Sequence, residues 1–305
     1  MKNEYQKFFG HLVLNAAKNK LHENMSKYQI GTKPGHRAQE HLFTIKSAIS
    51  LYTQYNKPLI LSTYEVSKYF DRESLQDCLN ELYKCNIKGK VYRLMYKLNE
   101  NTQIQVNTPV GMSEKEDVGE SVGQGTVEGA VISAVNLDSG VRDFFRNSVD
   151  EVNYFGLELA PLLFQDDVAR LASSVSSAQS GNDRMDCVSA SKLLQLHKDK
   201  SCFTVFGSKK AKQHISQELS QSQLSISGSI MKQEKDIKCL GDHLSEGGLA
   251  ASAALTVDKR SSLVTRAIYE IRCVVDDCRS HIVGGITAGI DLWEVAVLPM
   301  LLNNS

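Results

Sequence analysis

The chain has 305 residues, a formal net charge of zero and 42% apolar residues, so it can bury a sizeable core. No window reaches the ~20 apolar residues of a membrane-spanning helix, and the first residues lack the apolar centre of a secretory signal. We therefore expect an intracellular chain, in cytoplasm or nucleus, without a membrane partner. Its seven cysteines form an odd set without a C-x-x-C pair, which argues against a disulfide framework, a disulfide-linked partner and a structural zinc site.

The charges are unevenly distributed along the chain. Residues 1–60 carry nine Lys and Arg against three Asp and Glu, whereas residues 61–180 carry eleven against eighteen. A basic arm followed by an acidic middle suits a cation site beside the path of a polyanion better than it suits a uniformly basic nucleic-acid binder.

The first half of the chain contains several predicted helices and two predicted strands. Helical spacing of apolar residues predicts helices up to about residue 27, over 39–55, over 72–85 and over 90–98. The stretch GTKPGHR breaks the pattern between the first two, because Gly and Pro disfavour regular helix. The apolar run at 58–64 predicts a buried strand, and the alternating segment 102–107 predicts a half-buried one.

The second half mixes strands and helices. After a polar loop at 113–124, the pattern predicts a helix at 127–141, a hairpin over 152–163 that resumes at Val168, a helix at 183–196 and a strand at 202–206. A Gln- and Ser-rich connection at 213–229 is the best candidate for a domain boundary, and the block 237–302 is expected to be mostly helical. This order predicts an α+β domain in which strands from distant parts of the chain lie side by side.

The stretch PLLFQDDVARL at 161–171 places two adjacent carboxylates inside an apolar run. Ionised neighbours repel and are costly to desolvate, so Asp166 and Asp167 need a turn open to water, a basic partner or a bound cation. A third acid, Glu65, lies at the end of the predicted strand 58–64. An isolated Asp pair is most often a solvated turn, so the surrounding motifs have to decide.

Six stretches in chain order together resemble the palm and last fingers motif of a reverse transcriptase, in particular that of non-LTR retrotransposons in animal genomes. They are QIGTKPG before a helix, TYEVSKYFD, the Gly-Gln-Gly at 123–125, FQDD, LQLHKDKSCFTVFG and KCLGDHL. The similarity runs from about residue 20 to the end of the chain. It implies a fragment or decayed copy that lacks the early fingers motifs and an upstream endonuclease.

The resemblance implies a right-hand polymerase architecture. Partial basic fingers would occupy 1–58, an α+β palm with an antiparallel sheet and helices on one face would occupy 59–212, and a thumb-like helical region would occupy 213–305. The implied activity is that of an RNA-directed DNA polymerase, which adds dNTPs to a DNA primer on an RNA template.

The resemblance also implies site residues and a cofactor. Glu65, Asp166 and Asp167 would be the catalytic acids that hold two Mg²⁺ ions, or Mn²⁺, because such ions prefer carboxylate oxygens on rigid strands. Phe70 would lie under the incoming sugar, Gln124 and Gly125 would pack against template and nucleotide, and Lys200 would sit near the triphosphate. The alternatives are a core phenylalanine at a bend, a flexible helix start and an exposed lysine in a charged turn.

One departure from the family pattern concerns the first acid, which is Asp in active polymerases and Glu65 here. Its side chain is one methylene longer, and an octahedral ion tolerates such a displacement badly. Asp71 cannot replace it, since six residues of strand span ~20 Å. We therefore expect impaired catalysis on an intact fold.

Two alternatives to an active polymerase stay open. The first is an inactive retroelement remnant that at most binds nucleic acid, through its basic N-terminal arm and a lysine cluster. The cluster comprises Lys198, Lys200, Lys209, Lys210 and Lys212, which as loop lysines could equally form a solvated face. The second is an α+β scaffold unrelated to polymerases, whose Asp pair is a surface turn.

Overall fold

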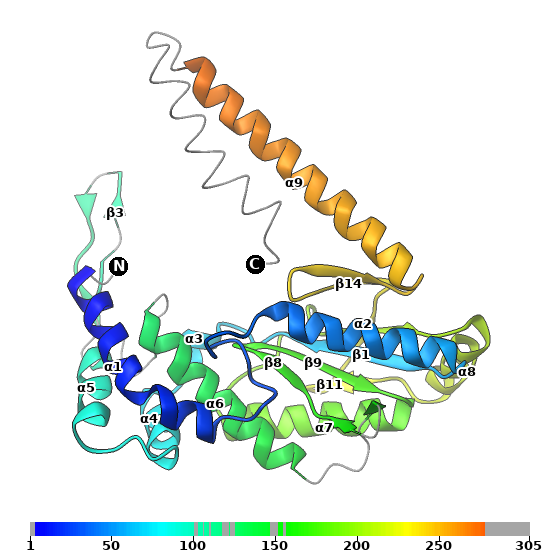
Figure 1. Ribbon diagram of the computed structural model, residues 1–305, viewed down its shortest axis with the longest axis horizontal. Coiled ribbons are helices and arrows are strands. Elements are labelled where there is room, and N and C mark those ends of the chain that lie inside the picture. Colours follow the sequence, from blue (N-terminus) through cyan, green and yellow to red (C-terminus); the bar gives the residue numbers. More distant parts are fainter. Residues whose placement is uncertain are drawn as a thin grey trace.

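A five-stranded sheet in the order β13-β10-β1-β9-β8 forms the centre of the fold (Figure 1). The computed structural model describes residues 4–100, 103–105, 107–109, 111–117, 122, 126–146, 152–154 and 157–277. The strands of the sheet are β1 Leu59–Tyr64, β8 Leu162–Phe164, β9 Asp167–Ala172, β10 Cys202–Phe206 and β13 Lys232–Gln233. β1 pairs antiparallel with both β9 and β10, β8 pairs antiparallel with β9, and β13 joins β10 in parallel. The expected α+β class with an antiparallel sheet is confirmed.

The remaining elements are helices of varied length and short hairpins. The helices are α1 Glu4–Asn24, α2 Ala38–Gln54, α3 Tyr69–Arg72, α4 Leu75–Lys84, α5 Gly89–Asn99, α6 Val127–Phe145, α7 Val175–Ser191, α8 Lys209–Gln221 and α9 Leu249–Asp277. The short strands are β2 Gln103–Ile104, β3 Asn107–Thr108, β4 Gly111–Met112, β5 Glu116–Asp117, β6 Val152–Tyr154, β7 Leu157–Leu159, β11 Ser225–Ile226, β12 Ser229–Ile230, β14 Asp236–Cys239 and β15 Asp242–Ser245.

The sheet is buried on both faces because successive side chains of a strand point in opposite directions. In β1, Ile60 and Tyr64 enter one core with α6, α7 and Ile215 of α8, whereas Leu59 and Leu61 enter another with α2 and the β14–β15 hairpin. The expected arrangement of helices on one face holds for α6, α7 and α8, and α2 covers the opposite face (Figure 1). A third core joins α1, α4, α5 and α6 at one end of the sheet.

Helix α9 starts from the β14–β15 hairpin and extends away from the sheet (Figure 1). Its root is attached through the buried Asp242, which accepts a hydrogen bond from Lys46 of α2 and, at 2.7 Å, from Arg260 of α9. Thr256 and Ser252 of α9 accept hydrogen bonds from backbone N–H groups of β15. The first turns of α9 are therefore held by polar contacts on two sides.

Three sequence predictions differ from the structure in this part of the chain. The Gln- and Ser-rich segment 213–229 is largely the continuation of α8, which starts at the N-cap Ser208, so the expected palm boundary at 212 falls inside a helix. β13 lies beyond that boundary and still pairs with β10. Residues 237–248 form most of a hairpin and a turn instead of a helix, and α7 begins at Val175, capped by Ser174, instead of at residue 183. The first turns of α7 and α8 contain few apolar residues, so the apolar pattern of the sequence does not reveal where these helices begin.

A buried arginine fixes how closely α7 approaches the sheet. Arg170 of β9 is almost completely buried and donates through Nη1 to the carbonyl of Ser177, at 2.9 Å. Its guanidinium passes so close to Gly181 of α7 that a Cβ there would lie 2.3 Å from Nη1 and 2.5 Å from Cζ. Only glycine lets the helix lie over this side chain.

We predict that Gly181→Ala destabilises the chain by about 1–3 kcal/mol, because the new methyl group must displace a buried, hydrogen-bonded guanidinium. Ser176→Ala, on the exposed side of the same helix, is the control and should change the free energy of unfolding by less than about 0.5 kcal/mol. Urea unfolding of both variants measures the difference. Equal stabilities for the two variants would contradict the packing described here.

Candidate active site

The pairing of β1 with β9 brings the three predicted acids to one end of the sheet. Tyr64 is opposite Val168 in the ladder, so extending the register by one residue places Glu65 opposite Asp167. The negative charge of Glu65 acts on both aspartates and disfavours their ionisation. Acids about a hundred positions apart in the chain thus lie at the same end of the sheet, because strands from distant parts of the chain are neighbours in it.

A tight hairpin turn presents the two aspartates. Phe164 of β8 pairs with Asp167 of β9, which leaves Gln165 and Asp166 as the two residues of the turn. Gln165 has a φ of 58°, in the left-handed region, and Asp166 does not. Asp166 is half-buried and the side chain of Asp167 reaches solvent. The turn therefore places two adjacent carboxylates at the rim of the sheet, open to water on one side.

Both aspartates are harder to ionise than usual. Partial removal from water raises the pKa of Asp166, and the charge of Glu65 adds to the effect. The same partial burial, followed by the charges of Asp166 and Glu65, raises the pKa of Asp167 to about 6, against a lesser opposing effect of Lys238. Partial burial and, after it, the neighbouring acids thus disfavour the ionised forms of both aspartates, and a bound cation would favour them.

Glu65 is held by its backbone and paired through its side chain. Its carbonyl accepts a hydrogen bond from the N–H of His197 at 2.7 Å, and its own N–H donates to the hydroxyl of the buried Ser201 at 3.2 Å. Its Oε1 lies 2.9 Å from Nζ of Lys200, and this contact raises the pKa of Lys200. The loop before β10 therefore brings Lys200 to the acid, so that two of the predicted site residues meet.

A hollow of about 470 Å³ lies beside Glu65 and is largely basic. Its charged and titratable lining comprises Glu65, Lys68, Arg72, His197, Lys198 and Lys200, with Asp199 as a second acid. Neither aspartate of the hairpin turn lines it. The space suits an anionic group that would approach Glu65 from the side of the loop before β10.

Among the other predicted substrate-binding residues, Phe70 lies in α3. Phe70 is half-buried in α3 and packs against two of the cores, with its ring edge-on to Tyr69 at a centroid distance of 5.5 Å. This position agrees with the alternative of a packing residue at a bend, and it does not test a role under a sugar. Gln124 and Gly125 lie outside the described residues.

The strand β10 divides the predicted lysine cluster into two groups. Lys198 and Lys200 precede β10, whereas Lys209, Lys210 and Lys212 follow it on α8. The five residues of β10 separate the two groups by roughly 17 Å along the strand. Lys212 is also engaged, since its Nζ donates to the carbonyl of Glu246 at 2.9 Å. The five lysines therefore do not form one patch around the acids.

A ready-made metal site is not present among the residues that the structure describes, since no three His, Cys, Asp or Glu side chains converge closely enough to hold an ion. The donor set nevertheless fits a hard cation, because it consists of carboxylates whose charge is poorly compensated. Glu65 would have to leave Lys200 to join Asp166 and Asp167. Magnesium binding by the three acids remains a prediction.

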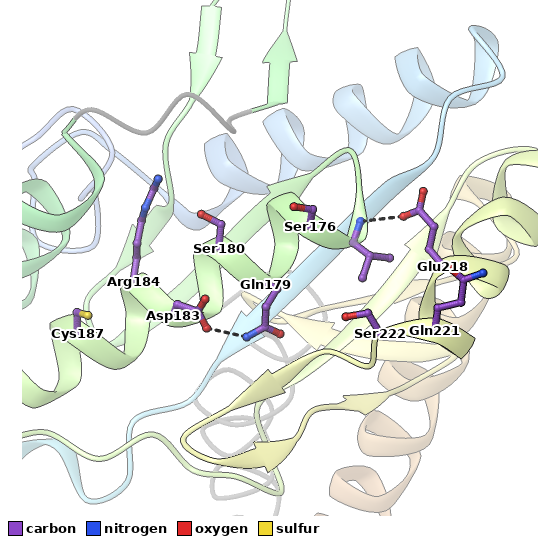
Figure 2. A pocket seen from close by; sticks show the side chains of 10 residues that line it. Ser176, Gln179, Ser180, Asp183, Arg184, Cys187, Glu218, Gln221 and Ser222 are labelled. Carbon is purple, nitrogen blue, oxygen red and sulfur yellow. Dashed lines mark hydrogen bonds between the residues drawn. The ribbon is translucent and has the colours of Figure 1, made fainter.

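A second hollow, of about 680 Å³, lies between α7 and α8 (Figure 2). Its lining is polar, and two of its contacts are internal: Glu218 accepts from the N–H of Val175 at 3.3 Å, and Gln179 donates to Asp183 at 2.7 Å. It extends along α7 from Val175 to Cys187, and none of the three predicted acids lines it.

Two groups that support the site were missed in the sequence. Ser201 anchors the backbone of Glu65, and Gln29 contacts the hairpin turn from a segment far upstream. Gln29 belongs to the Gln-x-Gly stretch of the fingers-like motif. A glutamine in a sequence does not by itself indicate which backbone groups its amide will bind. Both contacts depend on tertiary structure.

We predict that Asp167→Asn stabilises the chain in a pH-dependent manner. Because the pKa of Asp167 is raised from 3.8 to about 6, the folded state binds more protons than the unfolded state between these values, so the free energy of unfolding falls as the pH rises through this window. Removing the charge should therefore stabilise the chain above pH 6 by on the order of 1 kcal/mol after screening by solvent, and not below about pH 4.

Urea unfolding of the native chain and of Asp167→Asn, once above pH 6 and once below about pH 4 and without added metal, measures this effect. Asp71→Asn, which removes an exposed carboxylate of α3, is the matched control. A gain for Asp167→Asn of the same size at both pH values would contradict the assignment.

No protein-family model and no curated protein matches the chain. Among solved structures it is similar to telomerase from Candida albicans in complex with a TWJ fragment of telomeric RNA, with a TM-score of 0.51 and 11% identity over 77% of this chain and 36% of that one. Two structures of telomerase from Candida tropicalis have TM-scores of 0.48 and 0.49 at 9% and 11% identity. They are an apo form truncated from its C-terminal domain and a complex with the TWJ fragment, and each match covers 79% of this chain, against 43% and 35% of the telomerase.

The chain thus spans well under half the length of these telomerases. At such low identity the likeness concerns the fold alone. Among the described helices, none is long and apolar enough to cross a membrane. The chain has a mixed α+β fold that is similar to part of the telomerase from Candida albicans.

Proposed function

We propose that the chain is the palm-centred part of a reverse transcriptase of the non-LTR retrotransposon type, an RNA-directed DNA polymerase that adds dNTPs to the 3′-end of a DNA primer. The observation that carries the proposal is the strand register that places Glu65, Asp166 and Asp167 at the same end of the sheet, on a fold similar to that of telomerase. The sequence resemblance supplies the finer family and the RNA template.

In this proposal the three acids hold two divalent cations, Mg²⁺ or Mn²⁺, which when bound activate the primer 3′-hydroxyl and neutralise the leaving pyrophosphate. Asp166 and Asp167 contribute carboxylates from a turn fixed at the end of two paired strands. The basic hollow beside Glu65 would attract the triphosphate, with Lys200 as its nearest cation. Lys200 would then exchange its contact with Glu65 for one with a phosphate oxygen.

The alternative is a polymerase fold that binds nucleic acid without catalysis. One observation favours it: the longer side chain of Glu65 is paired with Lys200 at 2.9 Å and does not converge with the aspartates. An exposed pair of this kind contributes less than about 1 kcal/mol, so a cation could displace it. The extra methylene is the more serious obstacle, because it displaces the carboxylate from the position that an Asp would occupy.

We predict that Glu65→Asp raises DNA synthesis on an RNA template by up to about 100-fold over the native chain, because a displacement on the order of 1 Å at a reacting centre costs that much. Primer extension with an RNA template, a DNA primer, dNTPs and Mg²⁺ measures the rate. The combined variant Glu65→Asp with Asp167→Ala is the control and should be inactive.

Equal and robust extension by the native chain and by Glu65→Asp would show that Glu65 is no obstacle. Salt-dependent binding of primer–template without extension by either protein would support the inactive alternative instead. Absence of both binding and extension would reject the polymerase proposal for this chain.

A further inference from the structure

The hairpin turn that carries the aspartates is flanked by a segment from the N-terminal part of the chain. Tyr28 accepts a hydrogen bond from the N–H of Leu163 at 3.0 Å, and Ile30 donates to the carbonyl of Leu163 at 3.1 Å. Gln29 therefore lies beside Leu163 in a parallel bridge, next to β8 at the edge of the sheet. The segment extends the sheet by one short strand on the side of the turn.

The side chain of Gln29 holds the backbone of the turn on both sides. It is completely buried, its Nε2 donates to the carbonyl of Gln165 at 3.0 Å, and its Oε1 accepts from the N–H of Gln165, also at 3.0 Å. The same Oε1 accepts from the N–H of Gly31 at 3.2 Å. A primary amide can donate to and accept from one residue at the same time, as Gln29 does here.

The backbone conformation of Gln165 explains why the turn needs such support. A φ of 58° is unfavourable for a residue with a side chain, and the first position of a turn of this kind is normally glycine. A strained conformation persists only where neighbouring groups enforce it. The two hydrogen bonds from Gln29 supply that enforcement at the residue next to Asp166.

Gly31 makes the close approach possible. A Cβ at this position would lie 2.3 Å from the backbone nitrogen of Gln165 and 2.8 Å from the carbonyl carbon of Phe164, so no other residue fits without moving backbone. The base of the segment is fixed by the buried His41, whose Nε2 contacts the carbonyls of Tyr28 and Leu163 at 2.8 and 3.1 Å. The segment is thus rigidly seated where it meets the turn.

We propose that Gln29 is a positioning residue that fixes the hairpin turn and thereby sets the affinity of Asp166 and Asp167 for a divalent cation. This inference rests on the proposed function, because it assigns a metal to the two aspartates. A residue that orients metal ligands without contacting the metal itself typically contributes about 10–100-fold to metal affinity. The Gln-x-Gly stretch then supports the turn that carries the acids, through the side-chain amide of Gln29 and through the close approach of Gly31 to the backbone of Gln165.

The test compares Mn²⁺ binding by variants of the 305-residue chain. The electron paramagnetic resonance signal of free Mn²⁺ measures how much of the ion remains unbound. Gln29→Met removes both hydrogen bonds to Gln165, and the one from Gly31, at nearly constant volume and should weaken binding by at least about tenfold. Gly31→Ala, which pushes the segment away from the turn, should have the same effect and serves as the second variant if Gln29→Met does not fold. Hydrogen exchange of the Gln165 amide, measured without metal, should become faster in both.

A matched control exists elsewhere in the chain. Asp186 of α7 accepts hydrogen bonds from the N–H of Ser227 at 2.8 and 3.1 Å, and Ser227 also has a positive φ, of 49°, in the turn between β11 and β12. Asp186→Ala therefore loosens a strained hairpin turn remote from the acids, and it should leave Mn²⁺ affinity within about twofold of the native chain.

A rescue variant separates positioning from general support of the fold. Gln165→Gly removes the cost of the positive φ, so adding it to Gln29→Met should restore much of the lost Mn²⁺ affinity. Native affinity in Gln29→Met and Gly31→Ala, or equal losses in Asp186→Ala, would overturn the inference while leaving the metal site intact. Native Mn²⁺ binding that is unaffected by Asp167→Asn would instead reject the metal site of the proposed function, and the positioning role with it.

Discussion

The antiparallel pairing of β1 with β9 is the constraint on which the rest of the structure depends. It decides which side chains of β1 face α6 and α7 and which face α2, because a slip by one residue would exchange the two faces. The same register places the residue after β1 beside the first residue of β9, which are both acids. Core packing and assembly of the candidate site are therefore specified by one set of backbone hydrogen bonds, and neither can change without the other.

Four strands of this sheet, β1, β8, β9 and β10, were predictable because they lie in short apolar runs bounded by polar turns, as at 58–64 and 202–206. The fifth strand, β13, was not predictable because it consists of two exposed polar residues. Helix α8 was not, since among its residues only Ala211 and Ile215 are buried and the rest resembles a polar linker. The three acids could be proposed from motif order alone. The pairing of Lys200 with Glu65 and the hydrogen bonds from Gln29 to the backbone of Gln165 could not, because they are loop and edge contacts between segments distant in the chain.

The three acids at this end of the sheet lower the stability of the folded chain, which is the conflict with stability that the proposed function would entail. Three carboxylates share one rim of the sheet, and the structure offers them Lys200 and, more weakly, Lys238 as counter-charges. The elevated pKa of Asp167 is the cost of this arrangement to the folded chain. A cation would relieve it, whereas the pairing of Glu65 with Lys200 relieves it only in part, and at the expense of one potential ligand.

The central position of β1 also governs how the chain can fold. Its two neighbours, β9 and β10, lie far downstream, and β13 at the sheet edge follows later still. Contacts between residues so distant in sequence have high contact order, and their formation is slow because long loops must close first. During synthesis β1 would therefore remain unpaired on both edges until β9 has left the ribosome at residue 172, and on one edge until β10 has left it at residue 206. Its unpaired backbone groups and apolar side chains would be open to wrong partners during that time, so this strand is a place where a chaperone would help the chain to fold.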